Sequence, residues 1–395
     1  MNKTMRRRGE LARCLLAGLT IFGWQAAMRA DDGKDAKAEA ASSHQPEATI
    51  ATTWDQKAAA AYLDGRAKWW MEWPKSARDH ETFCVSCHTA VPYAMSRPAL
   101  RAALTENEKS ANERRLLENV TKRVRMWKEV APFYSDADRG AYKTVESRGT
   151  ESVLNALILA SNDAHGGQLS KDTLTALASM WAEQQINGER KGAWLWLRFA
   201  NEPWEADDSD FYGATLAAIA IGSAPENYAA RPEIQNNLKM LREYLNRQSA
   251  AQTTINRAVL LWASAKLPRL LAPEKQKAIV EEMLAKQRAD GGWSLAALAG
   301  DWKRHDGTPQ DLASDGYATG LITFALQQTG LSKEHPQVQR GLAWLVANQD
   351  KNEGYWPSSS LNNDSAHHMA PTTVRFMNDA ATAYAVLALS QEDNR

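Results

Sequence analysis

The feature that most constrains this chain is a helical periodicity that recurs from residue 54 to the end. Apolar residues repeat at the three-to-four-residue spacing of a helix face, and hardly any run alternates as a strand would. The expected helices span 55–72, 91–105, 108–129, 147–161, 170–186, 209–222, 231–247, 252–265, 272–288, 311–329, 335–349 and 376–390. We therefore expect an all-α fold in one domain over 54–395.

These helices are of two kinds. SVLNALILA, ATLAAIAIG, RAVLLWASA, GLITFALQQ and AYAVLALS are apolar on all sides, whereas NNLKMLREYLNRQ, EKQKAIVEEMLAKQ and HPQVQRGLAWLVANQ carry one charged face. A helix that is apolar all round has to be buried, and a helix with a polar face can meet water. The alternation therefore predicts that buried helices alternate along the chain with helices that meet water.

A short motif recurs where an amphipathic helix meets the apolar helix that follows it. MWAEQQINGERKGAWLWL, MLAKQRADGGWSLAAL and WLVANQDKNEGYWPSSSL each contain a glutamine at the helix end, a polar loop, glycine and tryptophan. The expected pairs are Gln185 with Trp194, Gln287 with Trp293, and Gln349 with Trp356. We interpret them as structural: the carboxamide bonds helix-end backbone while the indole packs over it.

These repeats, with RGLAWLVANQ before the last of them, resemble the QW motifs of the squalene-hopene cyclase and prenyltransferase superfamily. The resemblance covers roughly residues 140–390 and implies an (α/α)6 toroid with a central cavity. The count of twelve expected helices agrees with it, and 376–390 would close against 55–72. In such a toroid, every connection from an outer to an inner helix lies on one rim.

The amino terminus has the layout of a secretory signal peptide over residues 1–30. Three arginines, Arg6 to Arg8, precede an uncharged run from Cys14 to Met28, with cleavage expected after Ala30 or Ala27. An uncleaved anchor is the alternative, although the run is short for a transmembrane helix. Residues 31–53 are small, polar and charged, which is typical of a disordered linker. We expect an exported, periplasmic protein without a transmembrane span after cleavage.

The stretch TFCVSCHT, residues 82–89, holds the two cysteines that remain after removal of the leader, Cys84 and Cys87. The spacing C-x-x-C-H is the attachment signature of c-type haem, with both thiols bonded to the porphyrin and His88 as the proximal iron ligand. A redox-active or structural disulfide is the alternative, whereas a closed zinc site would need further ligands. We expect one covalent haem c, held by a loop over about 73–98.

The sixth iron ligand has several candidates. Met95, in VPYAMSRPAL, is the nearest downstream thioether, and a methionine on an apolar helix face is more often core filler. The alternatives are an open position or one of the more distant side chains, which are Met71, His80, Met126, His367 and His368.

The toroid topology places the haem loop on the same rim as three polar connections. We therefore expect Cys84 to lie on the rim that carries Trp293 and Trp356. The polar connections contain Asp207, Asp208, Asp210, His305, Asp306, Asp311, Asp315, His367 and His368. ADDSD resembles the D-x-D-D motif with which the cyclases protonate their substrate, which would make Asp210 a catalytic acid, but its order is D-D-x-D. The alternative is that Asp210, Asp315 and Asp379 are helix N-caps.

The balance of basic and acidic residues does not favour a nucleic-acid-binding function. Lys+Arg and Asp+Glu are equal, at 47 each, so no general field would attract nucleic acid. The leading interpretation is a monohaem c-type cytochrome that exchanges electrons with a redox partner protein or a pocket-bound substrate. A terpenoid cyclase-like enzyme, or a haem-bearing sensor that binds a small apolar or isoprenoid ligand in the cavity, are the alternatives.

Overall fold

The structure, a computed structural model, describes residues 53–362 and 375–391. These residues belong to one compact unit, which spans Ile50–Arg395. The expected leader, all of the expected linker but Thr53, and the pair His367 and His368 lie outside the described residues.

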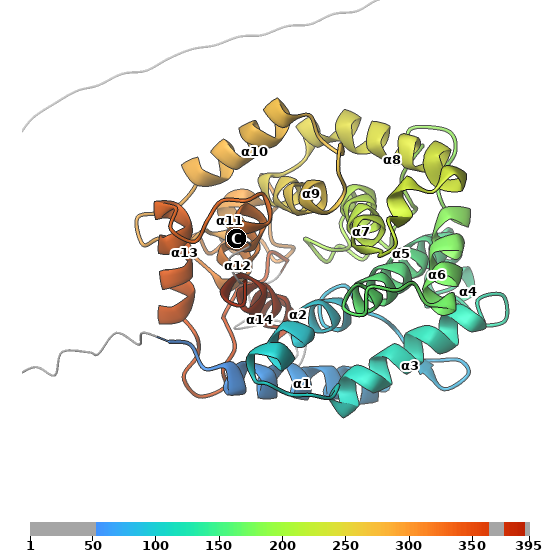
Figure 1. The fold of residues 1–395 in the computed structure, drawn as a ribbon, viewed down its shortest axis with the longest axis horizontal. Coiled ribbons are helices and arrows are strands. Elements are labelled where there is room, and N and C mark those ends of the chain that lie inside the picture. The colour runs from blue at the N-terminus through green and yellow to red at the C-terminus, as the bar shows by residue number, and fades with distance from the viewer. Residues whose placement is uncertain (1–52, 363–374, 392–395) are drawn as a thin grey trace, which may run out of the picture. The chain divides into compact units, whose positions relative to one another are not determined.

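The helices form two concentric rings (Figure 1). The inner ring consists of α2 (Ala90–Ala103), α5 (Lys143–Ala164), α7 (Ser209–Ser223), α9 (Thr254–Lys266), α12 (Gly316–Gln328) and α14 (Arg375–Leu389). The outer ring consists of α1 (Gln56–Glu72), α3 (Ala111–Arg125), α6 (Lys171–Ala182), α8 (Gln235–Gln248), α10 (Pro273–Ala285) and α13 (Pro336–Ala347). This is the all-α, (α/α)6 toroid that the sequence predicts, and each of the expected helices is present.

Shorter elements occupy the connections. They are the helices α4 (Asp136–Arg139) and α11 (Leu295–Leu298), the 3-10 turns Tyr228–Ala230, Pro232–Ile234 and Ser249–Ala251, and the strands β1 (Ala77–Arg78) and β2 (Thr82–Phe83). The two strands are antiparallel and pair Ala77 with Phe83 and Arg78 with Thr82. Strands of two residues are too short for an alternating pattern, so the sequence did not predict this hairpin.

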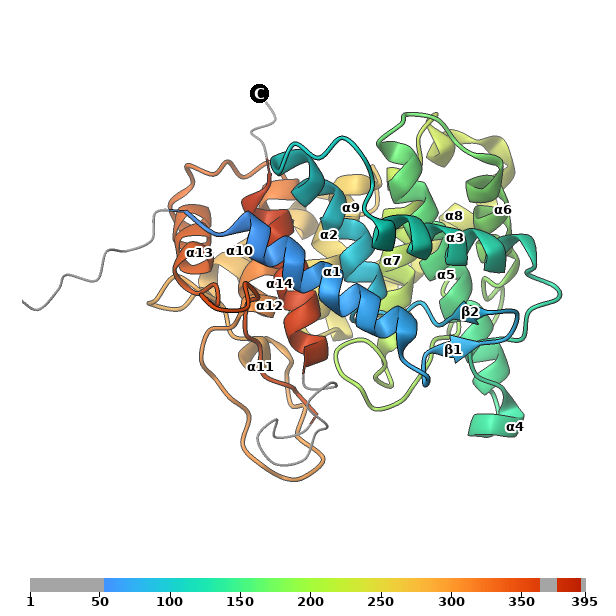
Figure 2. The ribbon, with the colours of Figure 1, turned by 90° about the horizontal axis from the view of Figure 1, so that it is seen from below.

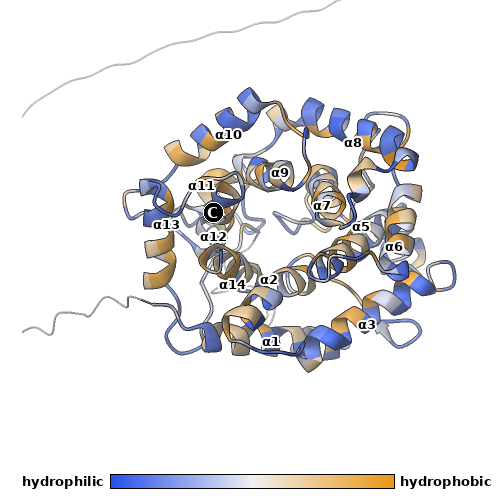
Figure 3. Cartoon of the chain, in the orientation of Figure 1, coloured by the Kyte–Doolittle hydropathy of each residue, from blue (hydrophilic) through white to orange (hydrophobic). Residues whose placement is uncertain are grey.

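Burial separates the rings as the sequence patterns indicate. Every residue of α7 from Ser209 to Ile221 is buried, whereas α8 buries only Leu238, Leu241, Tyr244 and Leu245, on one face. In Figure 3 the outer helices carry both blue and orange residues, whereas the inner helices are mostly pale to orange. The toroid is therefore stabilised mainly by apolar surface between the rings. Across the described ranges, no helix has the length and apolarity to cross a membrane.

The tryptophans of the three repeats are fully buried and hold the connections to the outer helices. The indole Nε1 of Trp194 donates to Met180 O (2.6 Å), that of Trp293 to Met283 O (2.8 Å), and that of Trp356 to Leu345 O (2.7 Å). The structural interpretation of these residues is confirmed.

The glutamines tie each outer helix to the next. Gln287 Nε2 donates to Gly291 O and Gln337 O, and Gln349 Nε2 to Gly354 O and Asp55 O. In the first repeat, Gln185 was the wrong choice. Gln184 is the buried residue that donates to Gly192 O and Asn237 O, whereas the Gln185 carboxamide only reaches Glu183 O. Adjacent glutamines point in different directions, and the sequence pattern cannot tell which one faces the next helix.

The ring closes between its first and last helices. Gln349 Oε1 accepts from Asp55 N (2.7 Å), and Trp54 packs on Trp356 with ring centroids 5.8 Å apart. Arg66 on α1 pairs with Asp379 on α14 (Nε–Oδ1 2.7 Å). The expected closure of the last inner helix against the first outer helix is confirmed.

The connections from outer to inner helices meet on one rim. α4 and α11 extend from the lower side of the rings in Figure 2, and the β1–β2 hairpin follows the lower end of α1. The 73–89 connection reaches the 183–208 connection through His88 and Trp204, whose ring centroids are 5.7 Å apart. Asn362, in the connection that follows Trp356, accepts from Glu202 N and His305 N. Cys84 therefore shares the rim with Trp293 and Trp356, as expected.

Candidate functional site

A cavity of about 310 Å³ opens on this rim, and the Cys-x-x-Cys-His segment forms one of its walls. This volume lies at the lower end of the range of about 300–1,000 Å³ that is usual for ligand pockets. The lining comes from three connections and three helices that are distant in sequence: Trp70, Trp73, Cys84, Val85, Ser86, Cys87, His88, Tyr134, Thr150, Leu197, Phe199, Asn201, Glu205 and Phe376.

Backbone hydrogen bonds fix the position of Cys84. Its N–H donates to Ser76 O (2.8 Å), and its carbonyl accepts from the indole of Trp70 (2.6 Å). The Asn119 carboxamide completes the edge of β2, accepting from Phe83 N (2.8 Å) and donating to Phe83 O (3.0 Å). The loop is thus held from both α1 and α3.

A buried ion pair supports the hairpin from behind. Arg123 and Glu151 are both fully buried, and the guanidinium donates to the carboxylate from Nε (2.5 Å) and from its second terminal nitrogen (3.1 Å). The remaining nitrogen of Arg123 donates to Thr82 Oγ1 on β2 (2.6 Å). A bidentate pair of this kind has a fixed geometry, so the strand that leads into Cys84 is rigidly placed.

Ser86, between the two cysteines, bonds the backbone at the start of the following helix. Its hydroxyl accepts from Thr89 N (3.2 Å) and Ala90 N (3.0 Å), and its carbonyl accepts from Val91 N. Ser86 thus satisfies N–H groups that have no partner within the helix, although the N-cap position itself is occupied by Thr89. This turn carries Cys87 and His88 to the start of α2.

Both cysteines are free, buried thiols. Burial raises the pKa of Cys84 to about 12 and that of Cys87 well above its usual value. Thiol–disulfide catalysts need a depressed pKa, because the thiolate is the nucleophile. The environment therefore does not favour a redox-active dithiol.

His88 is neutral and has its two nitrogens in different surroundings. Burial, with a smaller contribution from Arg66, lowers the pKa of its imidazole to about 3. Its Nδ1 lies 2.9 Å from the hydroxyl of Thr89, which itself donates to Asp379 Oδ2 (2.7 Å). The hydroxyl has one hydrogen, so it accepts from His88 Nδ1–H. Nε2 then carries the lone pair, and within 53–362 and 375–391 it makes no hydrogen bond.

Aromatic rings surround the imidazole. Phe376 stacks on it with centroids 3.7 Å apart, and Trp70 meets it edge-on at 4.9 Å. The sequence analysis missed both residues, because Phe376 is distant in the chain and Trp70 reads as an ordinary helix residue. These rings fix the plane of His88 and shield it from water.

Glu205 is the carboxyl group of the cavity, and the sequence analysis also missed it. Burial raises its pKa to about 7, against smaller opposing effects of the Asn201 carboxamide and the Lys143 ammonium. In NEPWEADDSD, Glu205 follows the buried Trp204, which was the available signal for a buried carboxyl group. The sequence analysis considered only the aspartates that come after it.

The candidate sixth ligands are not brought to the cavity. Met95 lies half-buried on α2, Met71 is buried on α1, and Met126 is half-buried at the end of α3. His80 is exposed in the hairpin turn and bonds to Asp79. Because none of these four residues belongs to the lining, a role for Met95 as ligand stays a prediction that this geometry does not support.

Asp210 is held in the first turn of α7. Its Oδ2 accepts from Arg190 (2.5 Å) and Arg198 (2.9 Å), and its Oδ1 accepts from Trp196 N (3.1 Å). Burial raises the pKa of this carboxyl group, against the opposing effect of the two guanidinium groups, and both of its oxygens already accept hydrogen bonds. The arrangement favours an anchor for the 183–208 connection, and the catalytic role stays a prediction.

The capping interpretation holds for one of the three aspartates. Asp315 accepts from Ala318 N (3.0 Å) and is the N-cap of α12. Asp208 occupies the cap position of α7, which excludes Asp210, and Asp379 lies inside α14. Because Asp210 and Asp379 lie inside their helices, their carboxylates bond side chains from other segments.

The other polar rim residues are dispersed. Asp207, His305, Asp306 and Asp311 are exposed, and Asp208 is half-buried beside Asn256. Over the described residues, no cluster of three or more His, Cys, Asp or Glu side chains is arranged to hold a metal ion.

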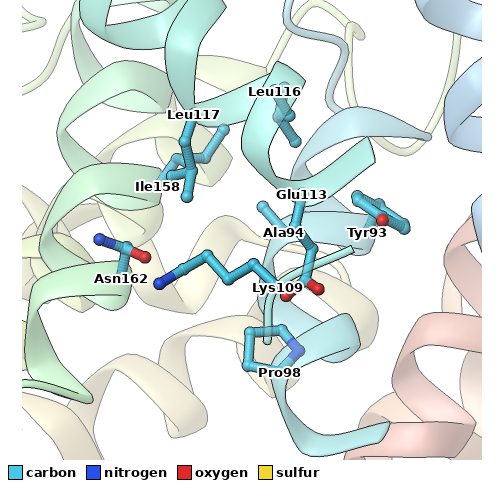
Figure 4. A pocket seen from close by; sticks show the side chains of 9 residues that line it. All are labelled: Tyr93, Ala94, Pro98, Lys109, Glu113, Leu116, Leu117, Ile158 and Asn162. Carbon is cyan, nitrogen blue, oxygen red and sulfur yellow. The ribbon is translucent and has the colours of Figure 1, made fainter. Parts of the chain in front are cut away.

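A second pocket lies between α2, α3 and α5 (Figure 4). Its volume is about 30 Å³, enough for water but far below that of the rim cavity. Its lining consists of Tyr93, Ala94, Pro98, Lys109, Glu113, Leu116, Leu117, Ile158 and Asn162.

Comparison with known proteins does not assign the chain to a family. No family model matches the chain, and no curated protein matches its sequence. Among solved structures, one that is similar is a variant of a protein called UGL in complex with dGlcA-Glc-Rha-Glc. The two chains are 11% identical, with 84% of this chain and 96% of the other covered at a TM-score of 0.47.

Proposed function

We propose that this chain is an exported monohaem c-type cytochrome whose haem occupies the rim cavity. The observation that carries the proposal is that the two thiols and His88, whose Nε2 makes no hydrogen bond within the described ranges, line one cavity. Cys84 and Cys87 would form the thioether bonds, each by addition of S–H across a vinyl group, and His88 Nε2 would bind the iron.

The chemistry that haem supplies is the one-electron exchange between ferric and ferrous iron. The residues of the chain would orient the axial imidazole, exclude water and define the path to a partner. Phe376 and Trp70 perform the first two tasks through their packing on His88.

An aromatic path connects His88 to partly exposed tryptophans at the C-terminal end of α1 and supports electron transfer. Trp70 contacts His88, Trp73 lies 5.5 Å from Trp70, and Trp69 stacks on Trp73 at 5.1 Å between centroids. Trp69 and Trp73 are half-buried, so they reach the surface. A redox partner protein that docks on this side of α1 would be within a few ring contacts of the iron ligand.

The alternatives have less support. Cyclisation would need a protonated Asp210, which two arginines oppose. An isoprenoid in the middle of the toroid would compete for space with Trp204, Tyr212, Tyr317 and Tyr384, all buried on or beside the inner helices.

The test is production of the chain in a bacterial periplasm with the haem-attachment machinery. Intact mass should rise by one haem, and the reduced spectrum should show the narrow α band of a c-type cytochrome. The double variant Cys84→Ala and Cys87→Ala should lose both, whereas Asp210→Asn, as the control, should keep both. Wild-type protein that matures folded but without bound haem would overturn the proposal.

A carbon monoxide titration separates the classes of haem protein. A reduced spectrum that carbon monoxide leaves unchanged supports electron transfer through a six-coordinate iron. A shift of the Soret band indicates an open sixth position and would replace electron transfer by gas binding or haem catalysis.

A further inference from the structure

We infer that Thr89 and Asp379 are positioning residues that set the reduction potential of the haem through His88. The inference rests on the proposed function, because it assigns His88 Nε2 to the iron. The relay consists of His88, Thr89 and Asp379: the imidazole Nδ1–H donates to the Thr89 hydroxyl, which donates to the carboxylate.

The direction of each hydrogen bond in the relay is fixed by Asp379. This carboxylate is fully surrounded by donors: Oδ1 accepts from Tyr62 OH (2.9 Å) and Arg66 Nε (2.7 Å), and Oδ2 from Arg66 (3.0 Å) and Thr89 (2.7 Å). A carboxylate that binds a guanidinium through both oxygens is an acceptor only. The Thr89 hydrogen therefore points to Asp379, and the Thr89 oxygen is left to accept from His88.

The relay determines which nitrogen of His88 can bind a metal. With Nδ1 protonated, the lone pair of Nε2 is available to the cavity, so the ligand tautomer exists before the haem arrives. A hydrogen bond from the second nitrogen of a metal-bound imidazole to an acceptor also raises its basicity, and here Asp379 polarises the Thr89 hydroxyl that accepts. A more basic ligand stabilises ferric over ferrous iron, which lowers the reduction potential.

Asp379 also ties α14 to α1 through Arg66, and that tie alone would explain its burial. Thr89 separates the two roles. It takes no part in the Arg66 pair, and its backbone N–H, which donates to Ser86, does not depend on the side chain. A change of its hydroxyl therefore alters the relay while the ring closure remains.

The experiment compares Thr89→Val with Thr89→Ser as the matched control, since serine retains the hydroxyl. In the haem-loaded full chain, Thr89→Val should shift the ferric–ferrous equilibrium at least tenfold toward the ferrous state, which is about 59 mV for one electron. The iron–histidine stretch in the resonance Raman spectrum of the ferrous protein should fall. Thr89→Ser should leave both the potential and the stretch at wild-type values.

A second variant and a haem-free readout complete the test. Asp379→Asn, which keeps an acceptor oxygen but removes the charge, should shift the potential in the same direction by a smaller amount. In full-length protein made without haem, the ¹⁵N shifts of His88 should report protonated Nδ1 and bare Nε2, and Thr89→Val should populate the other tautomer.

The outcomes distinguish the two proposals. Haem-loaded Thr89→Val with an unchanged potential and stretch would overturn the relay and leave the cytochrome assignment intact. Wild-type protein that never takes up haem would overturn the cytochrome assignment, and the ¹⁵N shifts would still decide whether Thr89 fixes the tautomer.

Discussion

The 73–89 connection and the three connections that contain Trp194, Trp293 and Trp356, here called the corners, all lead from an outer to an inner helix. The hydrogen bond between connection and outer helix nevertheless runs in opposite directions in the two cases. At the corners, an indole on the connection donates to a carbonyl of the helix, as Trp293 does to Met283. In 73–89, the indole belongs to the helix, and Trp70 donates to Cys84 on the connection. Cys84 is thus held by its backbone, and the side chains of Cys84, Cys87 and His88 line the cavity.

The two regions also differ in whether their polar side chains have hydrogen-bond partners. A corner uses its polar groups completely, as Gln349 shows by bonding both Asp55 and Gly354. The 73–89 connection is supported by charge behind the hairpin and leaves two thiols and one imidazole nitrogen toward the cavity. Equivalent positions in a repeat become a structural tie or a candidate site according to whether their polar groups already have partners.

The largest effect is expected from removal of a corner indole. Trp356→Ala leaves a cavity at a fully buried position and removes the bond to Leu345 O, so it should lower the free energy of unfolding by about 3–5 kcal/mol. Urea denaturation measures the change, and Trp356→Phe should lose clearly less. A loss below about 1 kcal/mol for the alanine variant would contradict the view of the corner as a lock.

Removal of the Arg123 charge behind the hairpin should lower stability by a comparable amount, and a second substitution should reverse much of the loss. Arg123→Met leaves Glu151 buried without its partner and should cost about 3 kcal/mol or more. The double variant Arg123→Met with Glu151→Leu should recover much of this loss, as measured by the same denaturation. If the double variant is less stable than the single one, the ion pair is not what supports the connection.

A pH-dependent contribution to stability should come from the cavity. The folded pKa of Glu205, about 7, lies above its unfolded value, so the native state binds the proton more tightly. Stability from this group is then greatest below about pH 4.5 and falls as pH rises to 7, by on the order of 2–3 kcal/mol. Glu205→Gln should remove this dependence, which unfolding of both proteins at pH 5 and pH 8 would measure. An equal pH response of the two proteins would refute it.

The smallest effect tests which glutamine ties the first corner. Gln184→Ala should cost about 1–3 kcal/mol, because it breaks bonds to Gly192 O and Asn237 O in a buried place. Gln185→Ala, the matched control, should change stability by less than about 0.5 kcal/mol, since its side chain is half-buried and bonds only locally. If Gln185→Ala costs more than Gln184→Ala, then Gln185 ties the first corner, as the sequence pattern predicted.

Site residues that are adjacent in the sequence were predicted, and those that are far apart were not. Cys84, Cys87 and His88 are adjacent, so their spacing alone identified them. Phe376 lies on the last inner helix, and Thr89 and Asp379 are 290 residues apart, so no local pattern connects them. Asp379 was taken for a helix cap because an aspartate near the start of an apolar run usually is one.

The sequence by itself determined the twelve helices of the toroid and which of them are buried, and its family resemblance implied the two rings and the rim that carries the Cys-x-x-Cys-His segment. Helix periodicity and the alternation of apolar and amphipathic helices are local properties, and the rim follows from counting connections. Only the tertiary structure decided which glutamine ties a corner, that Trp70 and Phe376 enclose His88, and that Asp379 directs its hydrogen bonds. These contacts join segments that the closed ring brings together, and their geometry depends on how all the helices pack.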